Sequence, residues 1–116
     1  MTRARILADL IFENINPQTG TTYTFALTDI NTLVTLNNSS AIAATIPTNA
    51  SVACPVGTIL NFSQNGSGQV TVSGASGVTV VSTGAAASAP KTRVTYSAAT
   101  AIQISADNWL VIGDIA

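Results

Sequence analysis

The segment QNGSGQVTVSGASGVTVVSTG, residues 64–84, decides the fold class of this chain. It contains no charged residue, no histidine and no cysteine, and its valines alternate with Thr or Ser on either side of a glycine-rich break. Alternation with a period of two is typical of β-strands that bury one face, and clusters of Gly, Asn and Ser are typical of turns. The segment therefore predicts two adjacent β-strands with their turns.

This segment belongs to a longer uncharged run, because Asp29 is the last charged residue before Lys91. Over the 116 residues only 8% are charged, 47% are hydrophobic and the net charge is −1. Average soluble proteins have roughly 25% charged residues. A neutral, hydroxyl-rich surface offers no general attraction to nucleic acid or to a membrane, and it suits packing against other copies or partners. We interpret it as an assembly surface.

Short segments of the same kind recur after Gly20, and no long helix is available to connect parallel strands. We therefore predict an all-β fold, an antiparallel β-sandwich of jelly-roll-like type, in one domain over residues 21–116. The expected strands cover residues 22–27, 33–36, 41–46, 58–63, 69–73, 78–82, 92–97, 101–105 and 108–112. The expected core contains Trp109 with Leu60, Phe62, Val70, Val72, Val78, Val80, Ile102 and Ile104.

Residues 1–20 differ in composition and are predicted to form a short N-terminal arm. Four of the nine charged residues fall in the first thirteen positions, and apolar residues there recur at helical spacing. This predicts a short amphipathic helix up to Asn14, followed by a turn over residues 14–20. Two interpretations stay open: the arm docks on a partner, or it packs on its own domain. The partner-binding candidates are Arg3, Arg5, Ile6, Leu7, Leu10, Ile11 and Phe12.

The residue types that carry reaction chemistry are scarce. Cys54 is the only cysteine and there is no histidine to activate it, so we expect a buried, inert thiol. Asp29, Asp107 and Asp114 each lie beside turn-like residues, where a carboxylate commonly binds nearby backbone amides, and none has a metal-binding spacing. We therefore expect no enzyme activity, no catalytic or metal-binding residue and no cofactor.

Two further patterns have simple structural explanations. Gly66 and Gly68 lack the third glycine and the following helix of a nucleotide-binding loop, so they predict a hairpin turn. Lys91 and Arg93 are expected on one face of a strand as solvated charges. The alanine-rich segment 84–90 predicts a loop.

Residues 55–116 contain, in order, PVGTILNFSQNGSGQVTV, SGVTVVS, RVTYSAAT and DNWLVIGDIA. This succession resembles a small β-rich domain of structural proteins from tailed bacteriophages, found in fibres and in capsid decoration (cement) proteins. With the upstream TYTFALTDINTLVTLNNSSAIAATIPTN, the resemblance covers about residues 21–116. It depends on the ordered set Gly57-Thr58, Gln64, Gly68-Gln69, Tyr96-Ser97 and 109–114. Cys54, where a larger apolar residue is expected, and the loop over 84–90 depart from the pattern.

The resemblance implies a virion structural protein, assembled in the bacterial host cytoplasm. It favours a capsid cement protein that stabilises the head shell, with the major capsid protein or another virion protein as partner and a homotrimer as the expected assembly. The alternative is a tail or head fibre protein that recognises a host surface glycan. A capsule-degrading hydrolase would need two suitably placed carboxylates, and the sequence gives no support for such a pair. Neither nucleic acid nor a membrane is expected as a partner.

Overall fold

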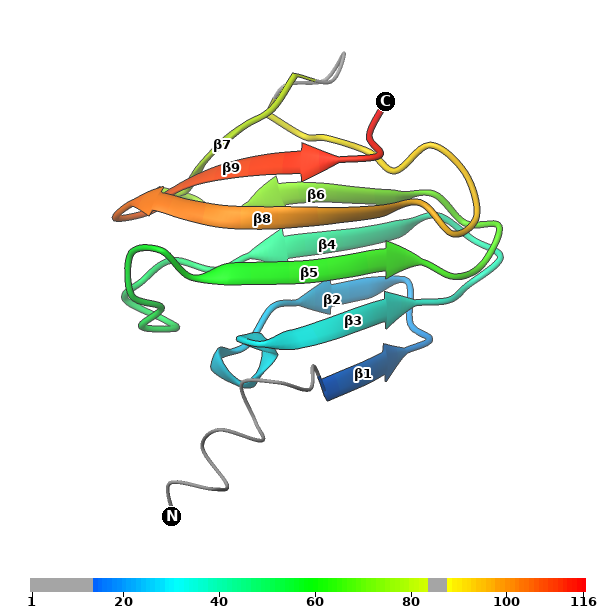
Figure 1. The fold of residues 1–116 in the computed structure, drawn as a ribbon, viewed down its shortest axis with the longest axis horizontal. Coiled ribbons are helices and arrows are strands. Elements are labelled where there is room, and N and C mark those ends of the chain that lie inside the picture. Colours follow the sequence, from blue (N-terminus) through cyan, green and yellow to red (C-terminus); the bar gives the residue numbers. More distant parts are fainter. Residues whose placement is uncertain (1–13, 84–87) are drawn as a thin grey trace.

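The computed structural model describes residues 14–83 and 88–116 (Figure 1). Within these residues the chain forms nine β-strands and one short 3-10 helix. The strands are short because Gly, Asn, Pro and Ser interrupt the alternating segments every few residues. In chain order the elements are β1 (Asn14–Gln18), β2 (Thr22–Thr24), η1 (Leu27–Asp29), β3 (Thr32–Leu36), β4 (Ile42–Ile46), β5 (Ile59–Gln64), β6 (Val70–Gly74), β7 (Thr79–Val81), β8 (Ala98–Ser105) and β9 (Asn108–Gly113).

The strands form two sheets, which we call the large sheet and the small sheet. The large sheet has the order β1-β3-β5-β8-β9-β7, and the small sheet has the order β2-β4-β6. Figure 1 looks onto the large sheet, with the small sheet behind it. From β1 to β6, consecutive strands alternate between the two sheets, so the chain winds as a coil. Each turn of this coil adds one strand to both sheets.

The winding makes most strand pairs parallel. Leu33 pairs with Asn61 in the large sheet and Ile42 pairs with Val70 in the small sheet, a step of 28 residues in both cases. Antiparallel pairing among the described strands is confined to β5 with β8 and β8 with β9. Strands β8 and β9 form a hairpin, and β8 joins this hairpin to the coil by pairing with β5 in the middle of the large sheet.

The β-rich prediction is confirmed, but the antiparallel arrangement is wrong for five of the seven pairings between described strands. Parallel neighbours need a crossover of about a dozen residues or more, and this crossover is usually a helix. Here a strand of the opposite sheet supplies each crossover within the coil, so no helix is required. The jelly-roll-like arrangement is not confirmed.

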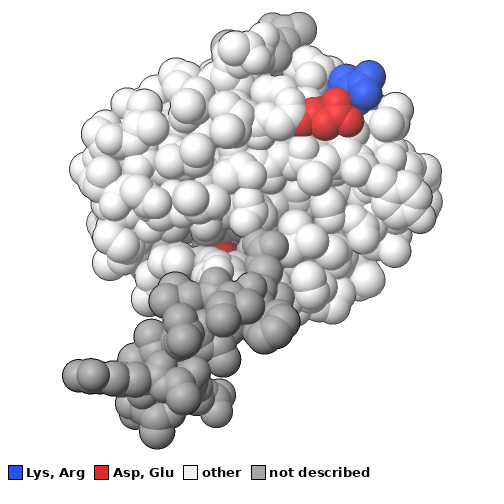
Figure 2. Space-filling view, viewed as in Figure 1, with Lys and Arg blue, Asp and Glu red and all other residues white. Residues whose placement is uncertain are grey.

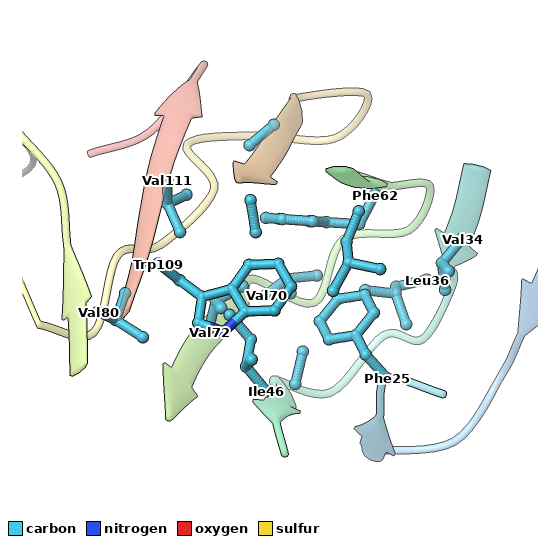
Figure 3. Packing of buried hydrophobic residues seen from close by; sticks show 14 of the residues in the cluster. Phe25, Val34, Leu36, Ile46, Phe62, Val70, Val72, Val80, Trp109 and Val111 are labelled. Carbon is cyan, nitrogen blue, oxygen red and sulfur yellow. The ribbon is translucent and has the colours of Figure 1, made fainter. Parts of the chain in front are cut away.

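One hydrophobic core lies between the two sheets and receives side chains from both (Figure 3). Trp109 is only 1% exposed, as predicted, and Phe25 packs against Phe62 with their ring centroids 5.9 Å apart. Ile102 and Ile104 do not belong to this core, although we predicted them there. They lie on the outer side of β8, whose buried positions are Ala99, Ala101 and Gln103.

The segment around Lys91 and Thr92 covers one side of the molecule. This side lies next to β6, the last strand of the small sheet. Lys91 bridges to Thr71 in β6, and Thr92 bridges to Ile115 beyond β9. The Thr92 hydroxyl also donates to the Gln64 side chain over 2.5 Å. The strand predicted over residues 92–97 is therefore wrong, because Val94 to Ser97 form a turn in which Tyr96 has a φ of 71°.

The structure also changes the prediction for the start of the chain. The turn predicted over residues 14–20 is instead largely strand β1, which pairs in parallel with β3. Pro17 fits there because β1 is the last strand of its sheet, where a missing backbone N–H is tolerated. The helix predicted up to Asn14 lies outside the described residues except for Asn14 itself, which begins β1.

Candidate functional site

The outer side of the large sheet carries a line of aliphatic side chains. The register places Ile59 opposite Ile102, Ile102 opposite Leu110, and Leu110 opposite Val81. Residues paired in register point to the same side of a sheet, so these four side chains cross β5, β8, β9 and β7 in one line. We call this line the aliphatic row. Ile59 is 46% exposed and Val81 is 40% exposed, while their neighbours in sequence Leu60 and Val80 are buried in the core.

A second row lies beside the aliphatic row on the same face. It joins Ile15, Leu33, Asn61, Thr100 and Ile112 across β1, β3, β5, β8 and β9. Its ends are aliphatic, and Ile15 and Ile112 are 59% and 47% exposed. Its middle is polar, and there the Thr100 hydroxyl donates to Asn61 Oδ1 over 2.7 Å. This hydrogen bond means that a covering surface would not leave that hydroxyl proton without an acceptor.

The face is not flat, because short side chains alternate with long ones. A shallow hollow of about 410 Å³ lies over Ala98 and Thr100, with Leu33 and Ile112 among the residues that line it. A second hollow of about 420 Å³ lies between Ile59 and the loop over residues 55–58. The face therefore combines projecting aliphatic side chains with adjacent depressions.

The six strands of the large sheet contain no charged residue among their described positions. Figure 2, which looks onto this sheet, shows a largely uncharged face, with blue and red atoms meeting near one edge and a small red area beside the grey atoms. Exposed aliphatic side chains without charge are costly to leave in water and favour contact with another apolar surface. This outer face of the large sheet is our candidate functional site, and we call it the aliphatic face.

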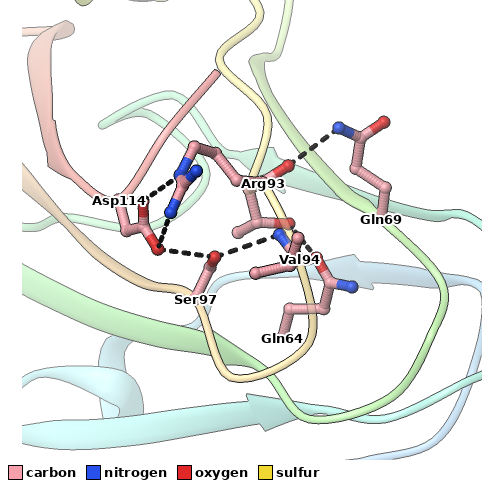
Figure 4. Close-up of polar contacts among 7 residues, drawn as sticks. Gln64, Gln69, Arg93, Val94, Ser97 and Asp114 are labelled. Atoms are coloured by element: carbon pink, nitrogen blue, oxygen red, sulfur yellow. Dashed lines mark hydrogen bonds and ion pairs between the residues drawn. The ribbon is translucent and has the colours of Figure 1, made fainter.

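An ion pair lies just beyond the end of β9 (Figure 4). The Arg93 side chain donates two hydrogen bonds to the Asp114 carboxylate, and the Ser97 hydroxyl donates a third over 2.8 Å. The hydrogen bond from Arg93, followed by that from Ser97, holds the pKa of Asp114 below its usual value. We predicted backbone amides as the partners of Asp114 and a solvated Arg93, but the two side chains bind each other. Both are exposed, so the pair contributes little to stability.

Asp29 is the one buried carboxylate within the described residues, and its partners hold the first turn of the coil together. It accepts hydrogen bonds from the Tyr23 hydroxyl at 2.5 Å, the Ala26 amide at 2.8 Å and Asn16 Nδ2 at 3.0 Å. Burial, followed by the bond to Asp29, raises the pKa of Tyr23 well above its usual value. The prediction of a backbone amide partner is confirmed for Asp29. Asp107 also accepts from a backbone amide, that of Asn49 at 2.8 Å, but this amide belongs to a distant part of the chain and is not the nearby one that was predicted.

Cys54 is buried, and burial raises the pKa of its thiol, as expected for an unreactive structural cysteine. Across residues 14–83 and 88–116, no cluster of three or more His, Cys, Asp or Glu side chains is placed to hold a metal ion. No described helix is long and apolar enough to cross a membrane. The predicted partner-binding residues Arg3, Arg5, Ile6, Leu7, Leu10, Ile11 and Phe12 lie outside the described residues, so their role stays a prediction.

The sequence reasoning missed the aliphatic face, although a signal for it was present. In β9 the run Trp109-Leu110-Val111-Ile112 is apolar at every position rather than at alternate positions. A strand whose side chains are apolar on both faces is typical of a sheet that is covered on two sides. Trp109 and Val111 fill the core, so Leu110 and Ile112 indicate a second apolar surface on the outside.

No protein-family model matches the chain, and a search of curated proteins finds no match.

Proposed function

We propose that this chain is a structural protein of a bacteriophage virion and acts as a capsid cement protein that stabilises the head shell. The observation that carries the proposal is the aliphatic face, which is uncharged, exposed and built on a rigid sheet. The resemblance of residues 21–116 to phage structural domains supplies the virion context. We also propose to class the fold as a two-layer β-sandwich, because two sheets enclose one core.

The physical basis of the proposal is the free energy gained when exposed aliphatic side chains leave water. Covering apolar surface contributes about 25 cal/mol per Å², so each newly covered Ile or Leu adds on the order of 1 kcal/mol. In this proposal that free energy holds copies of the chain together, whereas a single contact of the chain with the shell is modest. A shell with many identical sites multiplies it when the protein is itself oligomeric, as in the proposed homotrimer. In this proposal the segment before β1 contacts the major capsid protein, and the virion is where the protein resides.

A fibre protein that recognises a host surface glycan is the second candidate, and one observation favours it. Tyr96 is 78% exposed and is held beside the turn over residues 65–68. The Tyr96 amide donates to the Gln64 carbonyl, and the Thr95 hydroxyl donates to the Gly66 carbonyl over 3.0 Å. An exposed aromatic ring beside polar loop groups is a surface on which a sugar ring can stack. The cement function is preferred because the aliphatic face extends over all six strands of the large sheet, whereas the glycan candidate rests on one exposed ring beside one turn.

Quantitative mass spectrometry of purified phage particles tests the proposed function. We expect a copy number in fixed proportion to the major capsid protein, and particles that lack the chain should lose their DNA at a lower temperature. Adding the purified protein back should restore heat resistance. A copy number matching the tail fibres would favour the fibre function, and absence from the particles would overturn both.

The anchoring segment is tested by a deletion whose end point follows from the structure. Removing residues 2–13 leaves β1 and its pairing with β3 in place, whereas a longer deletion would remove a strand of the large sheet. We expect the shortened protein to fold, as judged by circular dichroism, and to be lost from the particles. Full occupancy by the shortened protein would show that the segment is not the anchor.

A further inference from the structure

We infer that the aliphatic face is covered by the same face of other copies of this chain, so that the large sheets meet in the interior of a homo-oligomer. The inference rests on the proposed assembly function and names the partner of its main surface. In the proposed homotrimer, the three large sheets surround the symmetry axis.

The charge distribution favours a copy of the chain over a different protein. Near a symmetry axis each residue lies close to its own equivalent, so any charge there would face a like charge at close range. The strands of the aliphatic face contain no charge among their described positions, and they meet this requirement without exception. Arg93 and Asp114 lie beyond the end of β9, and they pair with each other within one chain.

The relief of the face also suits contact with itself. The aliphatic row projects as a ridge, and the hollow over Ala98 and Thr100 lies beside it. Both features follow the spacing of about 4.8 Å that β-sheets share, and the face of another copy has this spacing together with the same ridge and hollow. The projecting side chains of one copy, Ile59 among them, can therefore enter the hollow of the next.

Two hydroxyl groups on the face have hydrogen-bond acceptors within the chain. Thr100 donates to Asn61 across the second row, and the Ser63 hydroxyl donates to Asn65 Oδ1 over 2.6 Å. These hydroxyl protons already have acceptors within the chain. Removal of water from them therefore avoids the penalty of a donor left without a partner.

The size of the face fits a reversible but specific contact. Six strands span about 24 Å across the sheet, and five to six residues span about 17–20 Å along it. The product of these spans is about 410–480 Å², roughly half of the 800 Å² per partner that standard protein interfaces bury, which is the range of weak, reversible contacts.

The test is the molar mass of the full chain in solution, measured by light scattering and sedimentation equilibrium over a range of protein concentrations. The test variant combines Ile59→Lys and Ile112→Lys, because both side chains are exposed and neither belongs to the core. The matched control combines Thr22→Lys and Thr24→Lys, two exposed positions on the outer side of the small sheet. All proteins are first compared by circular dichroism and by Trp109 fluorescence, which reports a folded core.

We expect an oligomer for the wild-type chain and for the control, and a monomer for the test variant at the same concentration, with association weakened at least a hundredfold. High salt should leave wild-type association unchanged or strengthen it, because no charge pair crosses the interface. If the lysine variant does not fold, Ile59→Thr with Ile112→Thr removes the same apolar surface without adding charge. A dimer or a trimer supports the inference if either variant dissociates it.

A wild-type chain that stays monomeric at all concentrations would overturn the inference, and so would an oligomer that folded face variants do not weaken. These results are separable from the proposed function. A monomer that nevertheless occurs in particles in proportion to the capsid protein overturns only the inference. An oligomer that the face variants dissociate, from a chain absent from particles, supports the inference and overturns the proposed function.

Discussion

The two sheets of this molecule share one core but present different outer faces. The large sheet exposes Ile15, Ile59 and Ile112, whereas the small sheet carries Thr22 and Thr71 at the outward positions of its strands. Neither outer face has a charged residue on its described strands. Water can hydrogen-bond to the hydroxyls of the small sheet, but it gains nothing from the aliphatic groups of the large sheet. The comparison teaches that low charge alone does not identify an interaction surface, and that the kind of neutral side chain does.

The largest loss of folding stability should come from a side chain that points into the core. A comparison of the two outer faces assumes that neither face is needed for folding. Phe62→Ala removes a fully buried ring, and we expect a loss of about 3–5 kcal/mol in the free energy of unfolding. Its outward neighbour in the same strand provides the control, because Asn61→Ala should cost no more than about 1 kcal/mol. Urea denaturation measures both. Equal losses would mean that the outer face also carries folding energy.

The next largest effect should be weaker self-association when the aliphatic face is given threonines like those on the outer side of the small sheet. Ile59→Thr together with Ile112→Thr replaces two exposed aliphatic groups by hydroxyl groups while retaining the β-branched shape that strands favour. We expect roughly 1–3 kcal/mol less association free energy, or about a tenfold to a hundredfold higher dissociation constant. The wild-type denaturation temperature should rise with protein concentration, and this dependence should weaken in the variant. A dependence that persists unchanged would place the contact elsewhere.

The reverse conversion should have a smaller effect. Thr71→Ile on the outer side of the small sheet adds one aliphatic group beside Ala43, its partner in register, whose side chain is short. We expect the folded state to be retained and association to strengthen by less than about 1 kcal/mol, visible in sedimentation velocity only as weak, concentration-dependent broadening. Strong new association from this single change would show that both faces are equally poised to self-associate.

The smallest effect concerns the ion pair beyond the end of β9. Because the pKa of Asp114 is lower in the folded protein than its ordinary value of 3.8, this group stabilises the fold above that value. The contribution is lost as the pH falls further, through the lowered pKa. Arg93→Gln removes the main cause of the shift. We therefore expect the denaturation temperature of this variant to fall slightly less steeply than that of the wild type below pH 3.8. Identical acid profiles would show that the pair contributes nothing measurable.

The positions of most strands could be predicted from the sequence, because alternation of side chains is a local signal. The prediction was close for β3, β4, β5, β6 and β9, where apolar residues alternate with Thr, Ser or Asn. The partners of the strands could not be predicted in the same way. Alternation tells which side of a strand is apolar, but it does not tell whether the next strand lies in the same sheet or in the opposite one.

The prediction of which β8 side chains point inward was wrong because it ignored the space that neighbouring core side chains occupy. Its outward positions hold Ile102 and Ile104, while Ala99 and Gln103 point inward, the reverse of a simple apolar-inside rule. In register, Ala99 lies beside Phe62 and Gln103 lies beside Trp109. Beside two large aromatic side chains, little room is left for a larger group at the Ala99 position. The candidate site was missed for the same reason, because Ile102 was assigned to the interior.

The place of β8 between β5 and β9 also determines when the molecule can be completed during its synthesis. The coil from β1 to β6 leaves the ribosome first, and β5 then has one edge without a hydrogen-bonding neighbour and Phe62 without its cover from β8. Both needs are met only when residues 98–113 have emerged and the β8–β9 hairpin docks against the coil, taking Trp109 out of water in the same step. A nascent chain halted before residue 98 would present an open, apolar strand edge, which is the kind of edge that recruits other unfinished chains into aggregates.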